Sequence, residues 1–310
     1  MIAAAAASSA RAALDRATAR LAAAGVDTPR VDAEWLLAGL QGLGRAALAA
    51  RLDTAVPPAI GAAYEAAVRR RARREPLQHI LGWEEFCGLR LVVGPGALIP
   101  RPETETLVEK ALAFLGPAAA GRRLVIDVGT GTGAVACALA AARSDVRVVA
   151  VDVSKDAVAL ARRNVIALGL DDRVSVLAGD LLSGLGACAA DLIVSNPPYL
   201  PTATLPDLAP EIAAHEPRLA LDGGPDGLRV LRRLVADAPD RLTPGGALVV
   251  ETAGGPHAHA VAGLMRATGF ADVIVHPDLA GVDRFVTGVK QGPLLGEGSE
   301  GTIGAPCESR

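Results

Sequence analysis

Residues 125–133 read Val-Ile-Asp-Val-Gly-Thr-Gly-Thr-Gly, a short β-branched run that leads directly into a glycine-rich turn. An alanine-rich segment of helical character follows, so the order is strand, glycine turn and helix. This order lets a ligand approach the backbone closely at the N-terminus of the helix. The stretch therefore predicts an α/β domain with a ligand site at the turn.

Four more β-branched runs follow this turn along the chain, separated by segments of helical character. The five runs, including the first, are residues 124–128, 146–151, 174–177, 192–195 and 247–251. Such alternation is typical of a Rossmann-like, doubly wound, mostly parallel sheet. Two later runs, 273–275 and 285–289, lie too close together for a crossover helix, so we expect an antiparallel hairpin at one edge. Seven strands are predicted in all.

The chain that precedes this sheet has a different pattern. Up to about Arg74 the apolar residues recur at helical spacing, which predicts a small helical domain over residues 1–75. From residue 79 to 100 short β-type runs surround glycines, and we expect residues 76–102 to form a β-hairpin linker. The α/β domain then covers residues 103–290. Residues 291–310 are poor in apolar residues, and we expect this tail to be disordered.

Composition excludes several classes of protein. The net charge of -3 lacks the basic excess of a surface that tracks nucleic acid, so direct nucleic-acid binding is not expected. The four cysteines form no Cys-x-x-Cys pair and no histidine stands at ligand spacing, so neither a disulfide framework nor a metal site is predicted. The start lacks a cationic leader, and no apolar run approaches the roughly 18 residues of a membrane span. We expect a cytoplasmic protein that does not bind a membrane.

The glycine turn alone does not identify its ligand. Gly129, Gly131 and Ala134 also satisfy the dinucleotide fingerprint, so a nicotinamide enzyme stays open at this point. Asp152 ends the second strand and is placed to accept hydrogen bonds from ribose hydroxyls in either class of enzyme. The alternative is that Asp152 only begins a helix, with Ser154 as its cap.

The decisive residues come further along the chain. Asp180 and Leu181 follow the third strand, where a carboxylate or its neighbouring backbone could meet an adenine amino group. The tetrapeptide Asn-Pro-Pro-Tyr, residues 196–199, follows the fourth strand. A dehydrogenase has no use for this tetrapeptide. Here the sequence resembles the class I methyltransferases, and in particular the branch that methylates planar nitrogens.

The tetrapeptide suits a planar nitrogen, which is a poor nucleophile because its lone pair is delocalised. The Asn196 side-chain oxygen and the Pro197 carbonyl can each accept one N–H, and the two prolines stiffen the loop. Tyr199 can stack on the planar group. No base or metal is required, because the cofactor is already an activated electrophile. A simple turn is the alternative, but the position at a strand's carboxyl end, beside the glycine turn, favours a catalytic site.

Several segments carry a resemblance to one family. They are residues 76–82 (Pro-Leu-Gln-His-Ile-Leu-Gly), 98–105 (Leu-Ile-Pro-Arg-Pro-Glu-Thr-Glu), 127–133, 195–199, 216–224 and 278–284. Over roughly residues 14–290 the chain resembles the HemK/PrmC methyltransferases, and the Arg-Pro-Glu-Thr-Glu segment is far more specific than the glycine turn. The chain departs from the family's usual pattern at His79 and over residues 251–257, which leaves local loop contacts in doubt.

This resemblance implies a class I methyltransferase fold and a protein-(glutamine-N5) methyltransferase. S-adenosyl-L-methionine would be the methyl donor. The acceptor would be the glutamine of the Gly-Gly-Gln motif in peptide-chain release factors, which the helical domain would contact. The expected cofactor-binding residues are Asp127, Gly129, Thr130, Gly131, Thr132, Gly133, Asp152, Asp180, Leu181 and Asn196. The expected substrate-binding residues are Asn196, Pro197, Pro198 and Tyr199, of which Asn196, Pro197 and Tyr199 are the catalytic ones.

Two other functions stay open. A nucleic-acid amino methyltransferase acting on adenine N6 or guanine N2 could use the same tetrapeptide. It would need a separate base-recognition region or additional positive charge. A catalytically silent cofactor-binding module is the other possibility, and the intact Asn196 and glycine turn argue against it.

A few charged side chains have two interpretations each. For the arginine run over residues 69–74 we favour a solvated helix end that complements the helix dipole over a patch for an acidic or RNA-bearing partner. Glu103 and Glu105 are expected to form a wall of the pocket. The histidines show no triad spacing, and we expect them on the surface or in loops. They are His79, His215 and His257.

Overall fold

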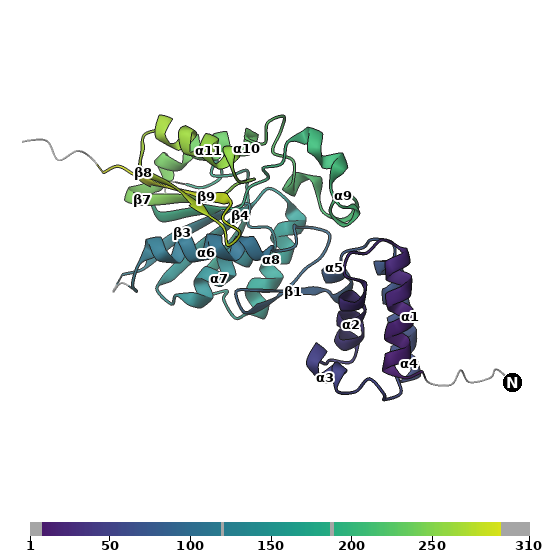
Figure 1. Ribbon diagram of the computed structural model, residues 1–310. Coiled ribbons are helices and arrows are strands. Elements are labelled where there is room, and N and C mark those ends of the chain that lie inside the picture. The colour runs from purple at the N-terminus through teal and green to yellow at the C-terminus, as the bar shows by residue number, and fades with distance from the viewer. Residues whose placement is uncertain (1–7, 119–120, 187–188, 293–310) are drawn as a thin grey trace, which may run out of the picture.

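The computed structural model describes residues 8–118, 121–186 and 189–292, and it consists of a helical domain beside a larger α/β domain (Figure 1). The helical domain contains α1 (Ala10–Ala23), α2 (Pro29–Leu40), α3 (Arg45–Ala49), α4 (Pro58–Arg71) and α5 (Leu77–Leu81). Pro29 and Pro58 open their helices, where the fixed φ of proline suits the first turn. Leu14, Leu37 and Tyr64 are buried between the helices in one apolar core.

The short helix α5 corrects one expectation. We expected β structure from residue 79, but residues 79–81 belong to α5, which Gly82 ends in the left-handed conformation. Leu77, Ile80 and Leu81 follow the i, i+3, i+4 spacing of a helix and pack on the core of the helical domain. The hairpin itself is shorter and consists of β1 (Trp83–Phe86) and β2 (Leu89–Val92).

The described part of the α/β domain holds a seven-stranded sheet. Its strands are β3 (Arg123–Val128), β4 (Val146–Asp152), β5 (Val174–Ala178), β6 (Ala190–Ser195), β7 (Leu242–Glu251), β8 (Phe270–Pro277) and β9 (Asp283–Lys290). Their order is β5-β4-β3-β6-β7-β9-β8, and β9 runs antiparallel to both neighbours. The doubly wound, mostly parallel sheet and the antiparallel hairpin at its edge are confirmed.

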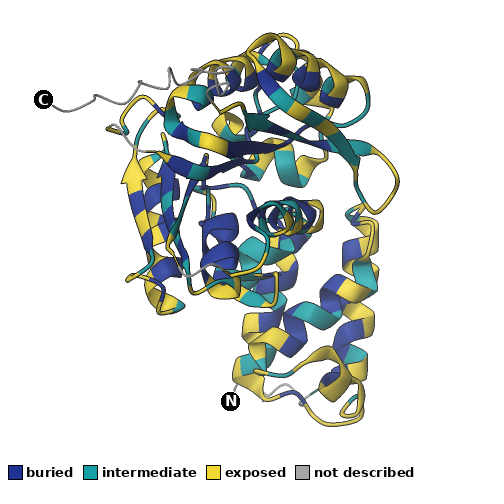
Figure 2. Cartoon of the chain, turned by 90° about the vertical axis from the view of Figure 1, so that its left-hand side faces the viewer, coloured by how far each residue is buried: buried dark blue, intermediate teal, exposed yellow. Residues whose placement is uncertain are grey.

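Helices cover both faces of the sheet (Figure 1). One face carries α6 (Pro102–Leu115), α7 (Ala134–Ala142) and α8 (Lys155–Ala167), and the other carries α10 (Arg229–Asp237) and α11 (Pro256–Ala267). The central strands are rich in valine and isoleucine because both of their faces are buried (Figure 2). Their register brings the carboxyl ends of β3, β4 and β6 to one edge, where the ligand crevice of such folds lies.

The segment between β6 and α10 lies at the end of the α/β domain that faces the helical domain (Figure 1). It contains η1 (Thr202–Asp207), α9 (Pro210–His215) and η2 (Arg218–Ala220), and a further short helix, η3 (Ala238–Arg241), follows α10. Within the described ranges, no helix combines the length and the apolar character that crossing a membrane requires. Of the tail expected to be disordered, residues 293–310 lie outside the described residues.

An ionic network joins α4 to α9. The prediction of a solvated helix end is confirmed for Arg69, Arg70 and Arg73, which are exposed. It is wrong for Arg71, whose side chain is 8% exposed and pairs with Asp32 of α2 at 2.7 Å and with Glu211 of α9 at 2.8 Å. Arg74 also reaches Glu211, at 2.7 Å. These arginines are drawn inward because carboxylates from two other helices surround them, so the run connects the two domains. We call Asp32, Arg71, Arg74 and Glu211 the junction network.

Candidate active site

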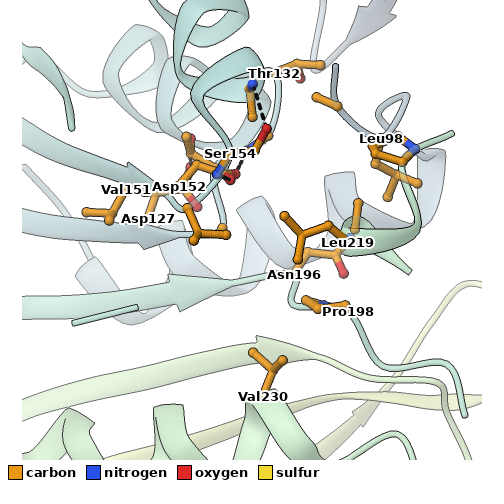
Figure 3. Close-up of a pocket in the computed structure, with 18 of the residues that line it drawn as sticks. Leu98, Asp127, Thr132, Val151, Asp152, Ser154, Asn196, Pro198, Leu219 and Val230 are labelled. Carbon is orange, nitrogen blue, oxygen red and sulfur yellow. Dashed lines mark hydrogen bonds between the residues drawn. The ribbon is translucent and has the colours of Figure 1, made fainter. Parts of the chain in front are cut away.

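A cavity of about 320 Å³ opens at the carboxyl ends of the central strands (Figure 3). Its walls come from the glycine turn, the end of β4 and the loop after β6. The loop after β5, the segment that leads into α6, the first turns of α6 and α10, and residues 217, 219 and 220 before α10 also contribute. Each central strand thus delivers its following residues to the same place, as the parallel register requires.

The glycine turn between β3 and α7 forms one wall of the cavity. Gly129, Gly131 and Gly133 have φ values of 73°, 56° and 81°, a region that glycine adopts without strain. A Cβ at Gly133 would stand 3.2 Å from the Cβ of Ala161 in α8, so the third glycine also allows these helices to pack closely. The predicted strand, turn and helix are therefore present in the expected order.

The carboxylate of Asp127 stabilises this turn by accepting hydrogen bonds. Its Oδ2 accepts hydrogen bonds from the Thr130 hydroxyl at 2.6 Å and from the Ala136 backbone N–H at 3.2 Å. Burial raises the pKa of Asp127 to about 7, although both hydrogen bonds oppose the rise. Asp127 also lines the cavity, so it contributes both to the turn and to the site.

Asp152 is the last residue of β4, and its carboxylate lies against the glycine turn (Figure 3). Oδ2 accepts the Gly131 N–H at 2.9 Å and Oδ1 accepts the Ser154 N–H at 2.9 Å. Ser154 is indeed the cap of α8, because its hydroxyl accepts the Ala157 N–H. Ser154 thus begins the helix, as the alternative interpretation held, while Asp152 lines the cavity, and its contact with a ribose stays a prediction. Burial raises the pKa of Asp152.

Asp180 and Leu181 line the cavity after β5. The Asp180 carboxylate is half exposed and pairs with Arg233 of α10 at 2.8 Å. Leu181 has a φ of 53°, which is uncommon for a leucine and marks a tight backbone turn at the wall. Sequence reasoning did not anticipate that α10 contributes Arg229, Val230 and Arg233 to this wall.

Side-chain hydrogen bonds hold the tetrapeptide after β6 in place. Asn196 lines the cavity, and its Nδ2 donates to the Thr104 hydroxyl of α6 at 3.0 Å. Its Oδ1 accepts no hydrogen bond from the residues that the structure describes. Pro198 also lines the cavity, whereas Pro197 and Tyr199 are absent from the described lining residues.

Glu251, at the end of β7, completes the arrangement. It is 1% exposed, and it accepts the Thr104 hydroxyl at Oε2 (2.8 Å) and the Tyr199 hydroxyl at Oε1 (3.2 Å). Burial raises the pKa of Glu251 to about 7 and raises that of Tyr199 as well. Sequence reasoning missed both Thr104 and Glu251 as parts of the site.

The expectation that Glu103 and Glu105 form a wall of the pocket is wrong. Glu103 is exposed, and Glu105 accepts the Cys87 backbone N–H at 2.7 Å. Thr104, between them, lines the cavity instead, because successive side chains of a helix point about 100° apart.

The three histidines do not lie in loops, since His79, His215 and His257 belong to α5, α9 and α11 and are partly buried. Nδ1 of His257 lies 3.4 Å from the Ala253 backbone nitrogen, and its Nε2 lies 3.3 Å from the Gly227 carbonyl oxygen. In the part of the chain that the structure describes, no group of three histidine, cysteine or acidic side chains could hold a metal ion.

Solved structures of methyltransferases share the fold. The hMettl16 catalytic domain, solved with a MAT2A 3'UTR hairpin, has a TM-score of 0.54 and 18% identity, covering 73% of this chain and 81% of that one. The 16S rRNA N2 methyltransferase RsmC of T. thermophilus, solved with AdoMet and guanosine, has a TM-score of 0.50 and 22% identity, covering 67% and 50%. At these identities the likeness establishes the class I methyltransferase fold alone.

Closer relatives match nearly the whole chain. Residues 12–82 match the family model of the PrmC N-terminal domain, and residues 110–224 match that of the methyltransferase small domain. The release factor glutamine methyltransferase of Geobacter sulfurreducens is 47% identical over 275 residues, covering 89% of this chain and 94% of the relative. The enzyme of the same name from Moorella thermoacetica is 45% identical, covering 88% and 96%. With this fold, this site and these relatives, the chain belongs to the family of release factor glutamine methyltransferases.

Proposed function

We propose that this enzyme transfers a methyl group from S-adenosyl-L-methionine to the N5 amide nitrogen of the glutamine in the Gly-Gly-Gln motif of peptide-chain release factors. The observation that carries the proposal is the arrangement of Asn196. Because its Nδ2 is engaged by Thr104, its Oδ1 remains as a hydrogen-bond acceptor in a cavity that also contains the glycine turn. A primary amide presents N–H donors that match such an acceptor.

The residues around the cavity fit the cofactor. Each carboxylate oxygen of Asp152 accepts one backbone N–H and has a second lone pair for a ribose hydroxyl. The left-handed glycines leave the backbone of the turn without side chains, which allows close approach of a ligand. Asp180 and Leu181 are the candidates for contact with the adenine ring. When bound, S-adenosyl-L-methionine supplies a methyl group already activated by the sulfonium charge.

The chain's own task in the reaction is orientation. We infer that Asn196 Oδ1 and the Pro197 carbonyl each accept one N–H of the glutamine amide, so that the nitrogen lone pair faces the methyl group. The prolines on either side of this carbonyl restrict the loop. The nitrogen becomes acidic as the new bond forms, so its proton leaves without a dedicated base.

The helical domain is proposed to hold the rest of the release factor. We place its boundary near residue 82, where α5 ends and the β1–β2 hairpin begins, with the hairpin as linker and residues 102–290 as the methyltransferase domain. The junction network supports this role, because it ties α4 to the segment that carries residues 217, 219 and 220 of the cavity wall. Since release factors act in translation, we propose a cytoplasmic location.

The test presents the purified enzyme and labelled cofactor with three acceptors. They are a folded release factor, the same factor with its Gly-Gly-Gln glutamine changed to alanine, and an unmethylated DNA duplex. Only the first is expected to gain a single methyl mass, located on that glutamine. Methylation of the duplex would favour the nucleic-acid alternative, and equal labelling of the alanine variant would move the acceptor to another protein site.

A further inference from the structure

The tetrapeptide is connected to a buried carboxylate by a chain of hydrogen bonds. Asn196 Nδ2 donates to Thr104 Oγ1 at 3.0 Å, and Thr104 Oγ1 donates to Glu251 Oε2 at 2.8 Å. Tyr199, at the other end of the tetrapeptide, donates its hydroxyl to Glu251 Oε1 at 3.2 Å. One carboxylate at the end of β7 thus holds both ends of the tetrapeptide, although α6, β7 and the loop after β6 are far apart in sequence.

This chain of hydrogen bonds has only one possible direction while Glu251 is ionised. A carboxylate only accepts, whereas a threonine hydroxyl has a single proton to donate. Because Thr104 gives that proton to Glu251, its oxygen can only accept from Asn196. The Asn196 amide must therefore turn its NH₂ group toward Thr104 and its oxygen away from it. If Thr104 were able to donate to Asn196 instead, the amide could reverse and turn its NH₂ group toward an incoming N–H.

We propose that Thr104 and Glu251 are positioning residues that fix the orientation of the Asn196 amide, so that its oxygen meets the amide N–H of the substrate. This inference rests on the proposed function, which requires an acceptor at Asn196 Oδ1. Neither residue touches the reacting atoms in this role. Through Tyr199, Glu251 also holds the far end of the tetrapeptide in place.

The cost of burying Glu251 supports a role beyond packing. A buried carboxylate is stabilised well by a cation, yet no cation among the described residues forms an ion pair with Glu251. The Arg284 guanidinium, which attracts it from β9, is paired with Asp278 at 2.8 Å. The side-chain partners of Glu251 are therefore two neutral hydroxyls. A neutral side chain would fill the same space with a smaller desolvation penalty. Carboxylates kept in such surroundings are concentrated at functional sites.

The decisive variants are Thr104→Val, which keeps the shape and removes the hydroxyl, and Thr104→Ser, which keeps the hydroxyl. With a release factor as substrate, we expect Thr104→Val to lower kcat at least about tenfold, because the amide loses its fixed orientation. The dissociation constant of S-adenosyl-L-methionine should stay within about twofold of wild type. Thr104→Ser should restore most of the rate. Thr106→Val is the matched control, since it makes the same change two residues along α6 at a similarly buried position outside this chain of hydrogen bonds.

Glu251→Met is the second variant, and it keeps the proposal testable if Thr104→Val does not fold. Methionine removes the carboxylate that accepts from Thr104, so the Thr104 hydroxyl becomes free to donate to Asn196 and reverse that amide, and we expect a similar loss in kcat. A rate near wild type in folded Thr104→Val or in folded Glu251→Met would overturn the positioning role. A loss that Thr104→Ser fails to restore, or an equal loss in Thr106→Val, would also overturn it. Failure of the wild-type enzyme to methylate the release factor would instead count against the proposed function.

Discussion

Replacing Asp152 by alanine tests the cofactor site most directly. The side chain ends β4, and each of its oxygens already accepts one backbone N–H, from Gly131 and from Ser154, both at 2.9 Å. One acceptor position per oxygen remains for the ribose hydroxyls of the cofactor. Alanine would remove both ribose hydrogen bonds and would also leave the Gly131 N–H of the glycine turn without its partner.

The expected magnitude follows from the number and kind of these hydrogen bonds. A hydrogen bond to a charged group contributes about 1.5–3 kcal/mol, so losing two costs about 3–6 kcal/mol in binding free energy. At roughly 1.4 kcal/mol per tenfold, the dissociation constant of S-adenosyl-L-methionine should rise about 10²–10⁴-fold. Asp152→Asn should weaken binding less, by about 10- to 100-fold, because one oxygen remains and the new NH₂ can still donate to a hydroxyl. That NH₂ would face a backbone N–H, so Asp152→Asn should also lower stability slightly.

Calorimetric titration of the purified variants with the cofactor measures this effect, and circular dichroism confirms that the fold is retained. Asp172→Ala is a suitable control, because Asp172 lies just before β5, at the opposite end of the sheet, with a side chain 68% exposed. Its affinity for the cofactor should equal that of wild type. An unchanged affinity in a folded Asp152→Ala enzyme would refute the assignment of Asp152 to the ribose.

Three further predictions concern the acceptor side, the junction network and pH. Asn196→Ala should leave cofactor affinity nearly normal and cut kcat at least about a hundredfold in a methyl-transfer assay; full turnover would refute its orienting role. Arg71→Met should lower the free energy of unfolding in urea by about 3–5 kcal/mol, since it leaves Asp32 and Glu211 facing each other without the shared cation; an unchanged midpoint would contradict this. Because burial raises the pKa of Glu251 to about 7, its acceptor-only form prevails only above that pH. The wild-type kcat should therefore rise through about pH 7, a step absent from Glu251→Gln; the same step in both would argue against Glu251 as its origin. The titratable groups that face Glu251 are Tyr199, Arg284 and Glu103.

Most of the sheet could be predicted from the sequence because its strands are short β-branched runs with both faces buried. The largest departure is β7, which begins at Leu242 and not at residue 247, while β8 also extends beyond the expected 273–275 to Phe270–Pro277. The first half of β7 contains Pro244, Gly245 and Gly246, residues that usually mark a turn and hide the strand. The pairing of β6 with β7 also shifts register between Ala190 and Leu192, an irregularity that periodicity cannot reveal.

The site was predictable where its residues are contiguous in sequence. The glycine turn and the tetrapeptide each carry their own local signal. Thr104 and Glu251 could not be found in this way, because they meet Asn196 and Tyr199 only through the packing of α6 and β7 around the loop. In the same way, the arginine run is interpreted as a solvated helix end until the fold brings Glu211 of α9 beside it.

The junction network also has a consequence for the order in which the chain is made. The helical domain consists of contacts between helices that are close in sequence, so it can fold early, while the ribosome is still synthesising the sheet. At that stage Arg71 already has Asp32 as its partner, but Glu211 has not yet been synthesised. The nascent helical domain must therefore be stable while Arg71 has only the first of its two carboxylate partners. The ion pairs that join the two domains can form only after α9 has left the ribosome and supplied the second carboxylate.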